Sequence, residues 1–264
     1  MSRIFITGSS DGLGLLSARL LVDQGHQVTL HARNEARAAD VRHALPQVEA
    51  VVVGDVSLIA EMRSVAEQVN VLGRYDAMIH NVGVGYRESR HETGDGLARF
   101  FAVNVLAPYL LTALITPPDR LVYLSSGMHN GGSADLSDPQ WKARRWNGSQ
   151  AYSDSKLFDA VLAFAVARRW PNVLSNAVEP GWVATKMGGA GAPDDLRLGA
   201  VTQAWLAVSD DSAAKVTGQY FYHQKLRRVQ QAARRPEVQG ELLAYCESLT
   251  GVALPGGPIQ SEPV

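Results

Sequence analysis

Short apolar runs and longer amphipathic segments alternate along this chain. The apolar runs end at turn-forming residues and are typical of buried strands: 4–6, 27–30, 49–53, 77–80, 121–124, 173–178 and 219–222. Between the first six runs lie segments with apolar positions at helical spacing: 13–24, 34–44, 57–72, 95–115 and 150–169. This alternation predicts βαβ crossovers, and therefore an α/β fold with a doubly wound parallel sheet of about seven strands and helices on both faces.

The sequence contains no internal repeat and no linker that would divide it into two domains. A chain of 264 residues can bury one substantial core. We therefore predict a single domain over residues 1–250. The end of the chain is rich in Pro and Gly from Pro255 onward, so we expect residues 251–264 to form a loose C-terminal tail.

Composition narrows the choice of partners. Lys and Arg number 25 against 26 Asp and Glu, so no overall field attracts nucleic acid or an anionic membrane. No segment approaches the ~18 uninterrupted apolar residues of a membrane span. Cys246 is the single cysteine, which excludes an intramolecular disulfide and a cysteine-based metal cluster. The seven histidines lack metal-binding spacing, so we predict no metal site.

A glycine-rich turn joins the first strand to the first helix. Its glycines let the backbone approach a pyrophosphate, and the helix N-terminus offers unpaired N–H groups. In this context the turn predicts dinucleotide binding and a Rossmann-type sheet. We expect cofactor contacts from Gly8, Ser9, Ser10, Asp11, Gly12, Leu13 and Gly14. Because the turn begins at Thr7, it leaves no room for a targeting segment, and we expect a cytoplasmic protein.

The end of the second strand indicates which dinucleotide is bound. An acidic side chain there would bond to a free ribose 2′-hydroxyl and favour NAD, whereas this chain has Ala32 followed by Arg33 and Asn34. A guanidinium suits bidentate phosphate binding, so the sequence favours NADP(H). Two alternatives stay open: Arg33 is an ordinary surface residue, or the Asp11 carboxylate repels the 2′-phosphate.

Tyr152 and Lys156 lie four residues apart in a predicted helix and therefore share one face. A free phenol titrates near pKa ~10, and an adjacent ammonium stabilises its ionised form. Such a pair can exchange a proton with a carbonyl or alcohol oxygen. Taken alone, this spacing more often marks a solvated helix face. Together with a nucleotide-binding turn, it predicts a site of acid–base chemistry.

These motifs together resemble the short-chain dehydrogenase/reductase family over about residues 3–222. The resemblance rests on the glycine motif, Asp55-Val56, Asn81-Val82-Gly83, Asn104, Ser125-Ser126, the Tyr152–Lys156 pair and the segment from Pro180 to Thr185. It implies a catalytic tetrad of Asn104, Ser126, Tyr152 and Lys156. Val82 departs from the family's usual Ala. The resemblance also implies cofactor contacts from Asp55, Val56, Asn81, Val82, Gly83, Tyr152, Lys156, Pro180, Gly181, Val183 and Thr185.

The same resemblance implies a mechanism. Hydride passes between the nicotinamide and a carbonyl carbon while Tyr152 gives its proton to the oxygen. Ser126 is expected to orient that oxygen, Lys156 to contact the nicotinamide ribose, and Asn104 to hold a water that passes protons to Lys156. The 25 residues between Ser126 and Tyr152 resemble the insert of the retinol-dehydrogenase-like and carbonyl-reducing branches. Those branches commonly use NADP, and they leave both a monomer and a homo-oligomer open.

Aromatic and sulfur side chains are candidates for an apolar substrate pocket. They are Trp141, Trp146, Trp182, Met187 and Tyr222, for each of which core packing is the alternative. For His129, three residues after Ser126, we weigh substrate contact and loop packing equally. A substrate loop is expected over about 182–210, and the glycines after Met187 suggest that residues 186–197 form a mobile lid.

The leading hypothesis is an NADPH-dependent oxidoreductase that reversibly reduces the carbonyl of a medium or bulky apolar ketone or aldehyde. The alternative from another class is a non-catalytic NADP-binding regulatory protein on the same fold. A sugar-nucleotide epimerase or dehydratase is disfavoured, because it needs a larger C-terminal substrate lobe than the ~40 residues that follow the last predicted strand.

Overall fold

One eight-stranded sheet organises the protein in the computed structural model, which describes residues 1–257. Its order is β3-β2-β1-β4-β5-β6-β7-β8. The strands are β1 (Arg3–Ile6), β2 (Gln27–Ala32), β3 (Ala50–Val53), β4 (Ala77–His80), β5 (Arg120–Leu124), β6 (Leu174–Glu179), β7 (Tyr220–Tyr222) and β8 (Lys225–Leu226). The predicted doubly wound parallel sheet is confirmed. Its eighth strand, β8, pairs antiparallel with β7 and was not expected from the sequence.

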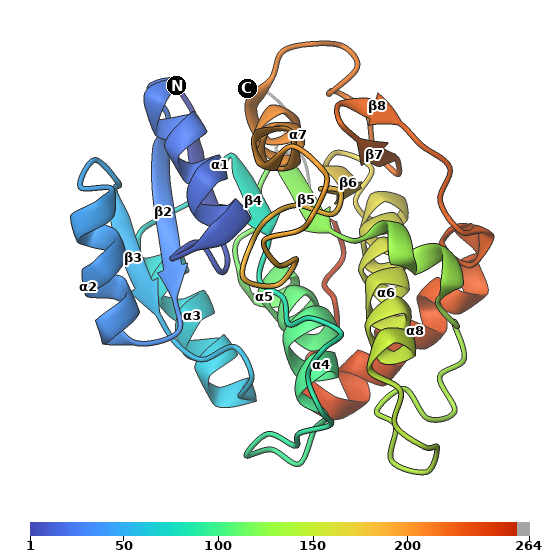
Figure 1. The fold of residues 1–264 in the computed structure, drawn as a ribbon. Helices are drawn as coiled ribbons and strands as arrows, with labels where there is room; N and C mark the ends of the chain where they lie inside the picture. Colours follow the sequence, from blue (N-terminus) through green and yellow to red (C-terminus); the bar gives the residue numbers. More distant parts are fainter. Residues whose placement is uncertain (258–264) are drawn as a thin grey trace.

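Helices cover both faces of this sheet (Figure 1). One core lies against α1 (Gly12–Asp23), α2 (Glu35–Ala44) and α7 (Leu196–Val208). The other lies against α3 (Ile59–Val71), α5 (Ala107–Leu114), α6 (Gly148–Arg169) and α8 (Pro236–Thr250). Because both faces of the sheet are covered, the central strands are almost continuously apolar. Short apolar runs in the sequence could therefore predict them. No helix in residues 1–257 is both long and apolar enough to cross a bilayer.

The predicted helix over 95–115 differs in detail from the observed structure. It consists of a short α4 (Arg99–Phe101), a π turn (Ala102–Leu106) and α5. The π turn contains Asn104, whose side chain is fully buried. Single π turns inside helices are frequently found at functional sites, and apolar periodicity does not reveal them.

The C-terminal segment begins with a left-handed Gly251 that ends α8. The Tyr109 hydroxyl donates to the Val252 carbonyl at 2.6 Å, and the Trp170 indole donates to the Pro255 carbonyl at 3.0 Å. Leu254 is 3% exposed and belongs to the core beside α5, α6 and α8. Residues 251–257, expected as the start of a loose tail, are therefore held against the domain. The rest of that predicted tail lies outside the described residues.

The order in which strands are added to the sheet reverses between β1 and β4. β2 lies on one side of this pair and β5 lies on the other. In open parallel sheets, ligands bind beyond the carboxyl ends of the strands at such a switch point. The predicted motifs follow those ends: the glycine turn after β1, Arg33 after β2, Asp55 after β3, Asn81 after β4, Ser126 after β5 and Pro180 after β6.

Candidate active site

A cleft of about 580 Å³ lies beyond the carboxyl ends of β1, β2 and β4. Most of the predicted cofactor residues line it: Gly8, Ser10, Asp11, Gly12, Leu13, Arg33, Asp55, Val56, Asn81, Val82, Gly83, Tyr152, Lys156, Pro180 and Thr185. Gly181 and Val183 line the neighbouring substrate cavity instead. The structure therefore brings the separate sequence motifs together along one cleft.

The glycine turn needs its glycines for two different reasons. Gly8 and Gly12 have φ values of 61° and 55°, in the left-handed region that favours glycine. At Gly14, a Cβ atom would lie 2.5 Å from Asn81 Nδ2, so only glycine lets the helix approach this closely. The Asn81 amide donates to the Thr7 and Gly8 carbonyls at 3.0 Å, which ties β4 to the turn. This cradle fits the pyrophosphate of a dinucleotide.

Buried polar contacts hold the turn in place. The Ser9 hydroxyl donates to the Ile6 carbonyl at 2.7 Å and accepts from the His31 amide at 2.9 Å. His31 Nδ1 accepts from the Gly8 amide, while Nε2 bonds to the Gly54 carbonyl at 2.8 Å. Burial lowers the pKa of His31, consistent with a neutral ring that makes both bonds. Ser9 thus supports the turn from inside and does not line the cleft; sequence reasoning missed His31 altogether.

Two arginines face the end of the cleft beyond β2. Arg33 and Arg37 both line it, and Ala32 is buried where an acidic residue would favour NAD. Arg37 was not predicted; it lies in the first turn of α2, four residues after Arg33, and this spacing was the available signal. Asn34, predicted to bind cofactor, instead caps α2 by accepting from the Arg37 amide at 3.0 Å.

The Asp11 carboxylate is already paired with cations. It caps α1 through the Gly12 amide, forms an ion pair with Lys186 and lies 3.5 Å from Arg37. The hydrogen bond from Lys186 is the main cause that lowers the pKa of Asp11. A paired carboxylate repels a nearby phosphate less than a free one does. The pairing of Asp11 therefore weakens the repulsion of a 2′-phosphate that the sequence left open.

The predicted tetrad converges at the centre of the site. Tyr152 lines both the cofactor cleft and the substrate cavity, and its hydroxyl lies 3.9 Å from Met187 Sδ. Ser126 lines the substrate cavity, and its hydroxyl accepts from the Met128 amide at 3.2 Å. The adjacent Ser125 hydroxyl donates to the Lys156 carbonyl at 2.7 Å, so its role is to attach β5 to α6.

Lys156 and Asn104 are buried behind the tyrosine. The Lys156 ammonium donates to the Leu124 carbonyl and to the Asp159 carboxylate, each at 2.7 Å. Asn104 accepts from the Val84 amide at 2.8 Å and donates to the Ser155 hydroxyl at 3.0 Å. These contacts fix the loop after β4 against α6. Sequence reasoning missed Asp159, because a carboxylate three residues after Lys156 reads as an ordinary helix ion pair.

The substrate cavity has a volume of about 450 Å³ and adjoins the cofactor cleft. Its predicted residues Trp182, Met187 and Tyr222 line it, together with Tyr86 and Met128. One polar group stands out at the end of β6: the Glu179 carboxylate is buried, forms an ion pair with Arg227 and accepts from the Tyr220 hydroxyl at 3.1 Å. The cavity is therefore largely apolar with a paired charge at one side.

His129 does not line the cavity, so its predicted substrate contact needs correcting. The ring is fully buried: Nδ1 bonds to the Ser126 carbonyl at 2.7 Å and Nε2 accepts from the Gln230 amide at 3.2 Å. Burial lowers the pKa of His129, consistent with a neutral ring in these two contacts. The loop-packing alternative holds, and the histidine fixes the turn that carries Ser126.

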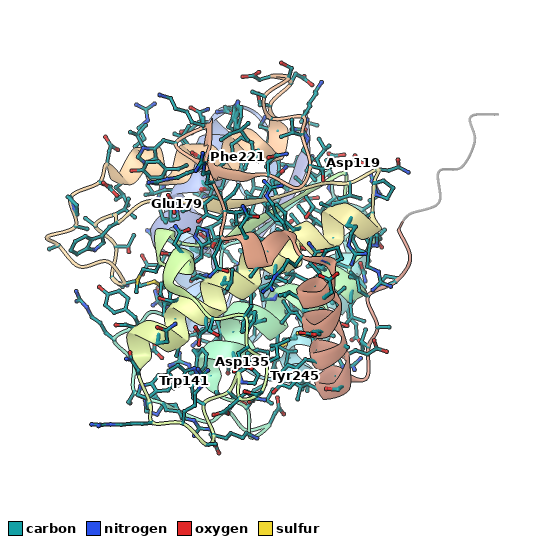
Figure 2. The ribbon with its side chains drawn as sticks, turned by 90° about the vertical axis from the view of Figure 1, so that its right-hand side faces the viewer. Asp119, Asp135, Trp141, Glu179, Phe221 and Tyr245 are labelled. Atoms are coloured by element: carbon teal, nitrogen blue, oxygen red, sulfur yellow. The ribbon has the colours of Figure 1, made fainter. Side chains whose placement is uncertain are left out.

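Two tryptophans of the insert also lie away from the substrate cavity. Trp141 is buried under the Arg144 guanidinium, which lies 3.8 Å from its ring centre, and Trp146 packs on Phe100. Figure 2 shows Trp141 well separated from Glu179, which lines the cavity. Core packing is thus the correct interpretation of both tryptophans, because an aromatic residue in a loop carries no sequence signal for the direction it faces.

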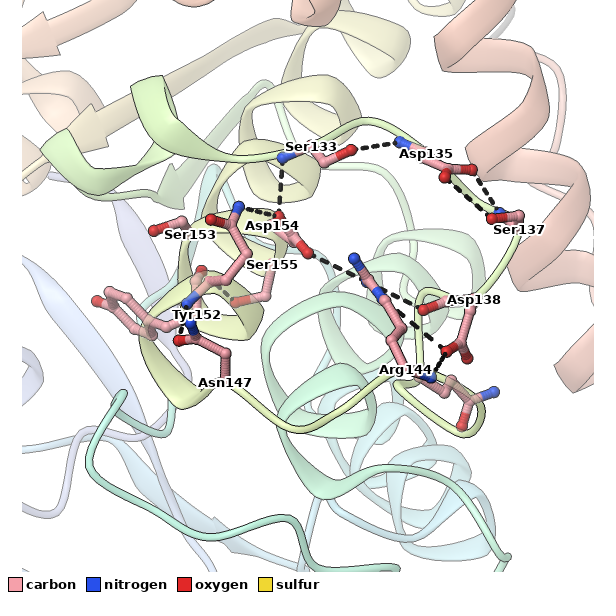
Figure 3. Close-up of polar contacts among 12 residues, drawn as sticks. Ser133, Asp135, Ser137, Asp138, Arg144, Asn147, Tyr152, Ser153, Asp154 and Ser155 are labelled. Carbon is pink, nitrogen blue, oxygen red and sulfur yellow. Dashed lines mark hydrogen bonds and ion pairs between the residues drawn. The ribbon is translucent and has the colours of Figure 1, made fainter.

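Carboxylates fold the insert and fasten it to α6 (Figure 3). Asp138 accepts from three successive backbone amides, those of Lys142, Ala143 and Arg144. Asp154 on α6 accepts from the Ser133 amide at 2.8 Å and pairs with Arg144 at 3.3 Å. Asn147 caps the helix by accepting from the Gln150 amide. The insert therefore positions the first turns of the helix that carries Tyr152.

The segment expected as a lid is bonded to both walls of the site. The Trp182 amide donates to the Asp194 carboxylate at 2.6 Å, and the Trp182 indole donates to the Gly188 carbonyl at 2.9 Å. Lys186 reaches Asp11 on the glycine turn, and Met187 lines both hollows. That residues 186–197 move as a lid stays a prediction. No group of three His, Cys, Asp or Glu side chains suited to a metal occurs in the described part of the chain.

The switch-point cleft, the glycine cradle and the four predicted catalytic residues have the arrangement expected of a dinucleotide-binding oxidoreductase site. A family model described as short chain dehydrogenase matches residues 2–195. The chain belongs to the short-chain dehydrogenase/reductase family, an oxidoreductase family, as its motifs predicted.

Several curated relatives match most of the chain. An uncharacterized oxidoreductase of Emericella nidulans is 44% identical over 262 residues, 97% of this chain and 100% of the relative. A candidate daunorubicin C-13 ketoreductase, DnrU, of Streptomyces sp. is 32% identical over 86% of this chain and 84% of its own. Retinol dehydrogenase 13 of Homo sapiens is 29% identical over 99% and 87%, in agreement with the predicted branch.

Among solved structures, an uncharacterized protein of Mycobacterium paratuberculosis superimposes with a TM-score of 0.83 at 25% identity. The superposition covers 97% of this chain and 95% of that chain. The likeness extends over the insert and the C-terminal helices, so the whole domain follows an architecture already seen in a solved structure.

Proposed function

We propose that this protein is an NADPH-dependent carbonyl reductase, reversible as an alcohol dehydrogenase, that acts on a medium or bulky apolar ketone or aldehyde. The observation that carries the proposal is the position of Tyr152, whose side chain lines both the cofactor cleft and the apolar substrate cavity. Its family membership supports the reaction class, and its similarity to a candidate ketoreductase supports the direction.

Each residue has a distinct task in this mechanism. When bound, the nicotinamide supplies or accepts a hydride. The Tyr152 hydroxyl gives its proton to the carbonyl oxygen, and the Ser126 hydroxyl orients that oxygen, because positioning provides a large part of a rate enhancement. Lys156 holds a positive charge behind the phenol, 5.8 Å from its ring centre. Arg33 and Arg37 bind the 2′-phosphate as a guanidinium pair.

The cavity supports an apolar substrate. Trp182, Met187, Tyr222 and Met128 offer apolar surface, and about 450 Å³ accommodates a ring system of moderate size. The Arg227–Glu179 pair offers a polar contact to one end of such a molecule.

The test is Tyr152→Phe, which removes one hydroxyl and leaves the ring. Turnover of a ketone panel with NADPH is expected to fall by about 10²–10⁴-fold, the usual contribution of a positioned acid, while NADPH affinity stays within about threefold. Tyr245→Phe is the matched control, because its hydroxyl bonds to Gln140 far from the site. Normal turnover in Tyr152→Phe would overturn the mechanism; NADPH binding without turnover in the wild type would favour the non-catalytic alternative.

A further inference from the structure

A buried carboxylate lies directly behind the predicted catalytic lysine. Asp159 follows Lys156 by three residues on α6, and its Oδ2 atom lies 2.7 Å from Lys156 Nζ. Lys156 is 4% exposed and Asp159 is 3% exposed. Ion pairs at this spacing are common on helix surfaces and contribute little there, but here both charges are removed from water, so each depends on the other.

The lysine's hydrogen bonds leave one direction free. An ammonium has three N–H groups, and two of them are taken by the Leu124 carbonyl and by Asp159. Lys156 nevertheless lines the cofactor cleft, and a Cβ atom added to Gly83 would lie 3.6 Å from Nζ. The two protein contacts therefore hold Nζ at the wall of the cleft, with one N–H left for a further acceptor.

The electrostatics of the pair agree with this geometry. Burial lowers the pKa of Lys156, but the attraction of Asp159, followed by that of Tyr152, outweighs it and leaves the pKa raised. Burial raises the pKa of Asp159 to about 6, while the charge of Lys156 and its hydrogen bond favour the ionised carboxylate. Two titratable groups lie on the strands across from α6: Tyr123 on β5, whose pKa burial raises, and His80 stacked on it, whose pKa burial lowers to about 3. Both are uncharged near neutral pH, which leaves Lys156 as the charge that acts on Asp159.

We propose that Asp159 is a positioning residue for the reaction, which keeps Lys156 charged and aimed at the cofactor cleft so that Lys156 can stabilise the ionised Tyr152. The inference rests on the proposed function for its catalytic meaning. Without Asp159, burial would dominate at Lys156 and the lysine would lose its proton more readily, so the positive charge behind the phenol would be lost.

The experiment compares Asp159→Asn with the wild type over pH. Asparagine keeps the shape and an acceptor but removes the charge. We expect the rising limb of alcohol oxidation with NADP to move up by at least about one pH unit, a tenfold loss of rate at a fixed pH on the limb. Asp154→Asn is the control, because it removes another buried carboxylate of the same helix, one that bonds to the insert and not to Lys156. Its loss is expected to lower turnover by loosening the insert but to leave the position of the limb unchanged.

A second measurement requires no substrate. NMR of isotope-labelled lysine side chains, assigned with Lys156→Arg, follows the protonation of Lys156 directly. We expect Lys156 to lose its proton at least about one pH unit lower in Asp159→Asn than in the wild type. If Asp159→Asn does not fold, Asp159→Leu removes the same charge with a side chain of the same branching and carries the same expectation.

The outcomes separate the two proposals. A limb that stays in place or moves down in folded Asp159→Asn would overturn the role of Asp159, as would an unchanged titration of Lys156. If Tyr152→Phe abolishes turnover while Asp159→Asn shifts neither measurement, only the present inference fails. If Tyr152→Phe keeps its turnover, the proposed function fails, whatever the titration of Lys156 shows.

Discussion

At the scale of single residues, we expect the choice between NADPH and NADH to depend on the charged side chains at the end of β2. Arg33 and Arg37 line this end of the cleft, and Asp11 is paired with Lys186 and Arg37. The guanidinium groups can bind a 2′-phosphate through charge-assisted hydrogen bonds, each of which contributes about 1.5–3 kcal/mol. NAD lacks that phosphate and gains nothing from them, so the proposed function predicts that the two arginines discriminate between the cofactors.

Arg33→Ala is therefore expected to weaken NADPH binding by about tenfold or more and to change NADH binding little, since a tenfold change corresponds to about 1.4 kcal/mol. Arg37→Ala should act in the same direction. Fluorescence titration with both cofactors measures the ratio. Arg42→Ala is the control, because Arg42 is on α2 but pairs with Glu35 outside the cleft. Equal losses for NADPH and NADH in Arg33→Ala would show that Arg33 does not recognise the phosphate.

The sequence predicted residues whose role follows from their order along the chain, and it missed those whose role depends on packing. The glycine turn, Asn81, Ser126, Tyr152 and Lys156 each follow a recognisable strand or share a helix face. Other roles follow from contacts between distant segments: His129 bonds to Gln230 and His31 bonds to the glycine turn. Asn34 illustrates a competing principle, since a short polar residue before a helix caps it as readily as it binds a ligand.

At the scale of elements, strands were easier to predict than the helices around the site. Strands buried on both faces show as short apolar runs, and all seven of the predicted runs correspond to strands. The π turn at Asn104 and the short strand β8 carry no comparable pattern, because tertiary contacts determine both. The Pro and Gly content of the C-terminal segment predicts a loose tail. In the structure, however, Leu254 packs into the core beneath the helices that cover one face of the sheet.

This packing makes the segment part of the domain's stability. Leu254→Ala removes a buried side chain and should lower the free energy of unfolding by about 2–5 kcal/mol, because the lost apolar burial leaves a cavity. Denaturant unfolding followed by tryptophan fluorescence measures the change. Leu226→Ala is the control: Leu226 is 65% exposed, and its truncation should change stability by less than about 0.5 kcal/mol. A loss below that value for Leu254→Ala would mean that residues 251–257 do not contribute to the core.

At the scale of the whole molecule, the switch point of the sheet brings two hollows together around one helix. The cofactor cleft lies beyond β1, β2 and β4, and the substrate cavity lies beyond β5 and β6. Tyr152 and Met187 line both, so in the proposed function the reaction takes place at their junction, between a nucleotide on one side and an apolar molecule on the other. This shared wall is the structural basis of the proposed carbonyl reductase.

The most direct test of this account is a titration of the wild-type protein with NADPH and with NADH, followed by nicotinamide fluorescence. The account predicts saturable binding of NADPH, with NADH at least about tenfold weaker, because Arg33 and Arg37 contact a phosphate that only NADPH carries. A preference for NADH would contradict the role given to these arginines. Binding of neither cofactor would contradict the proposed reductase itself.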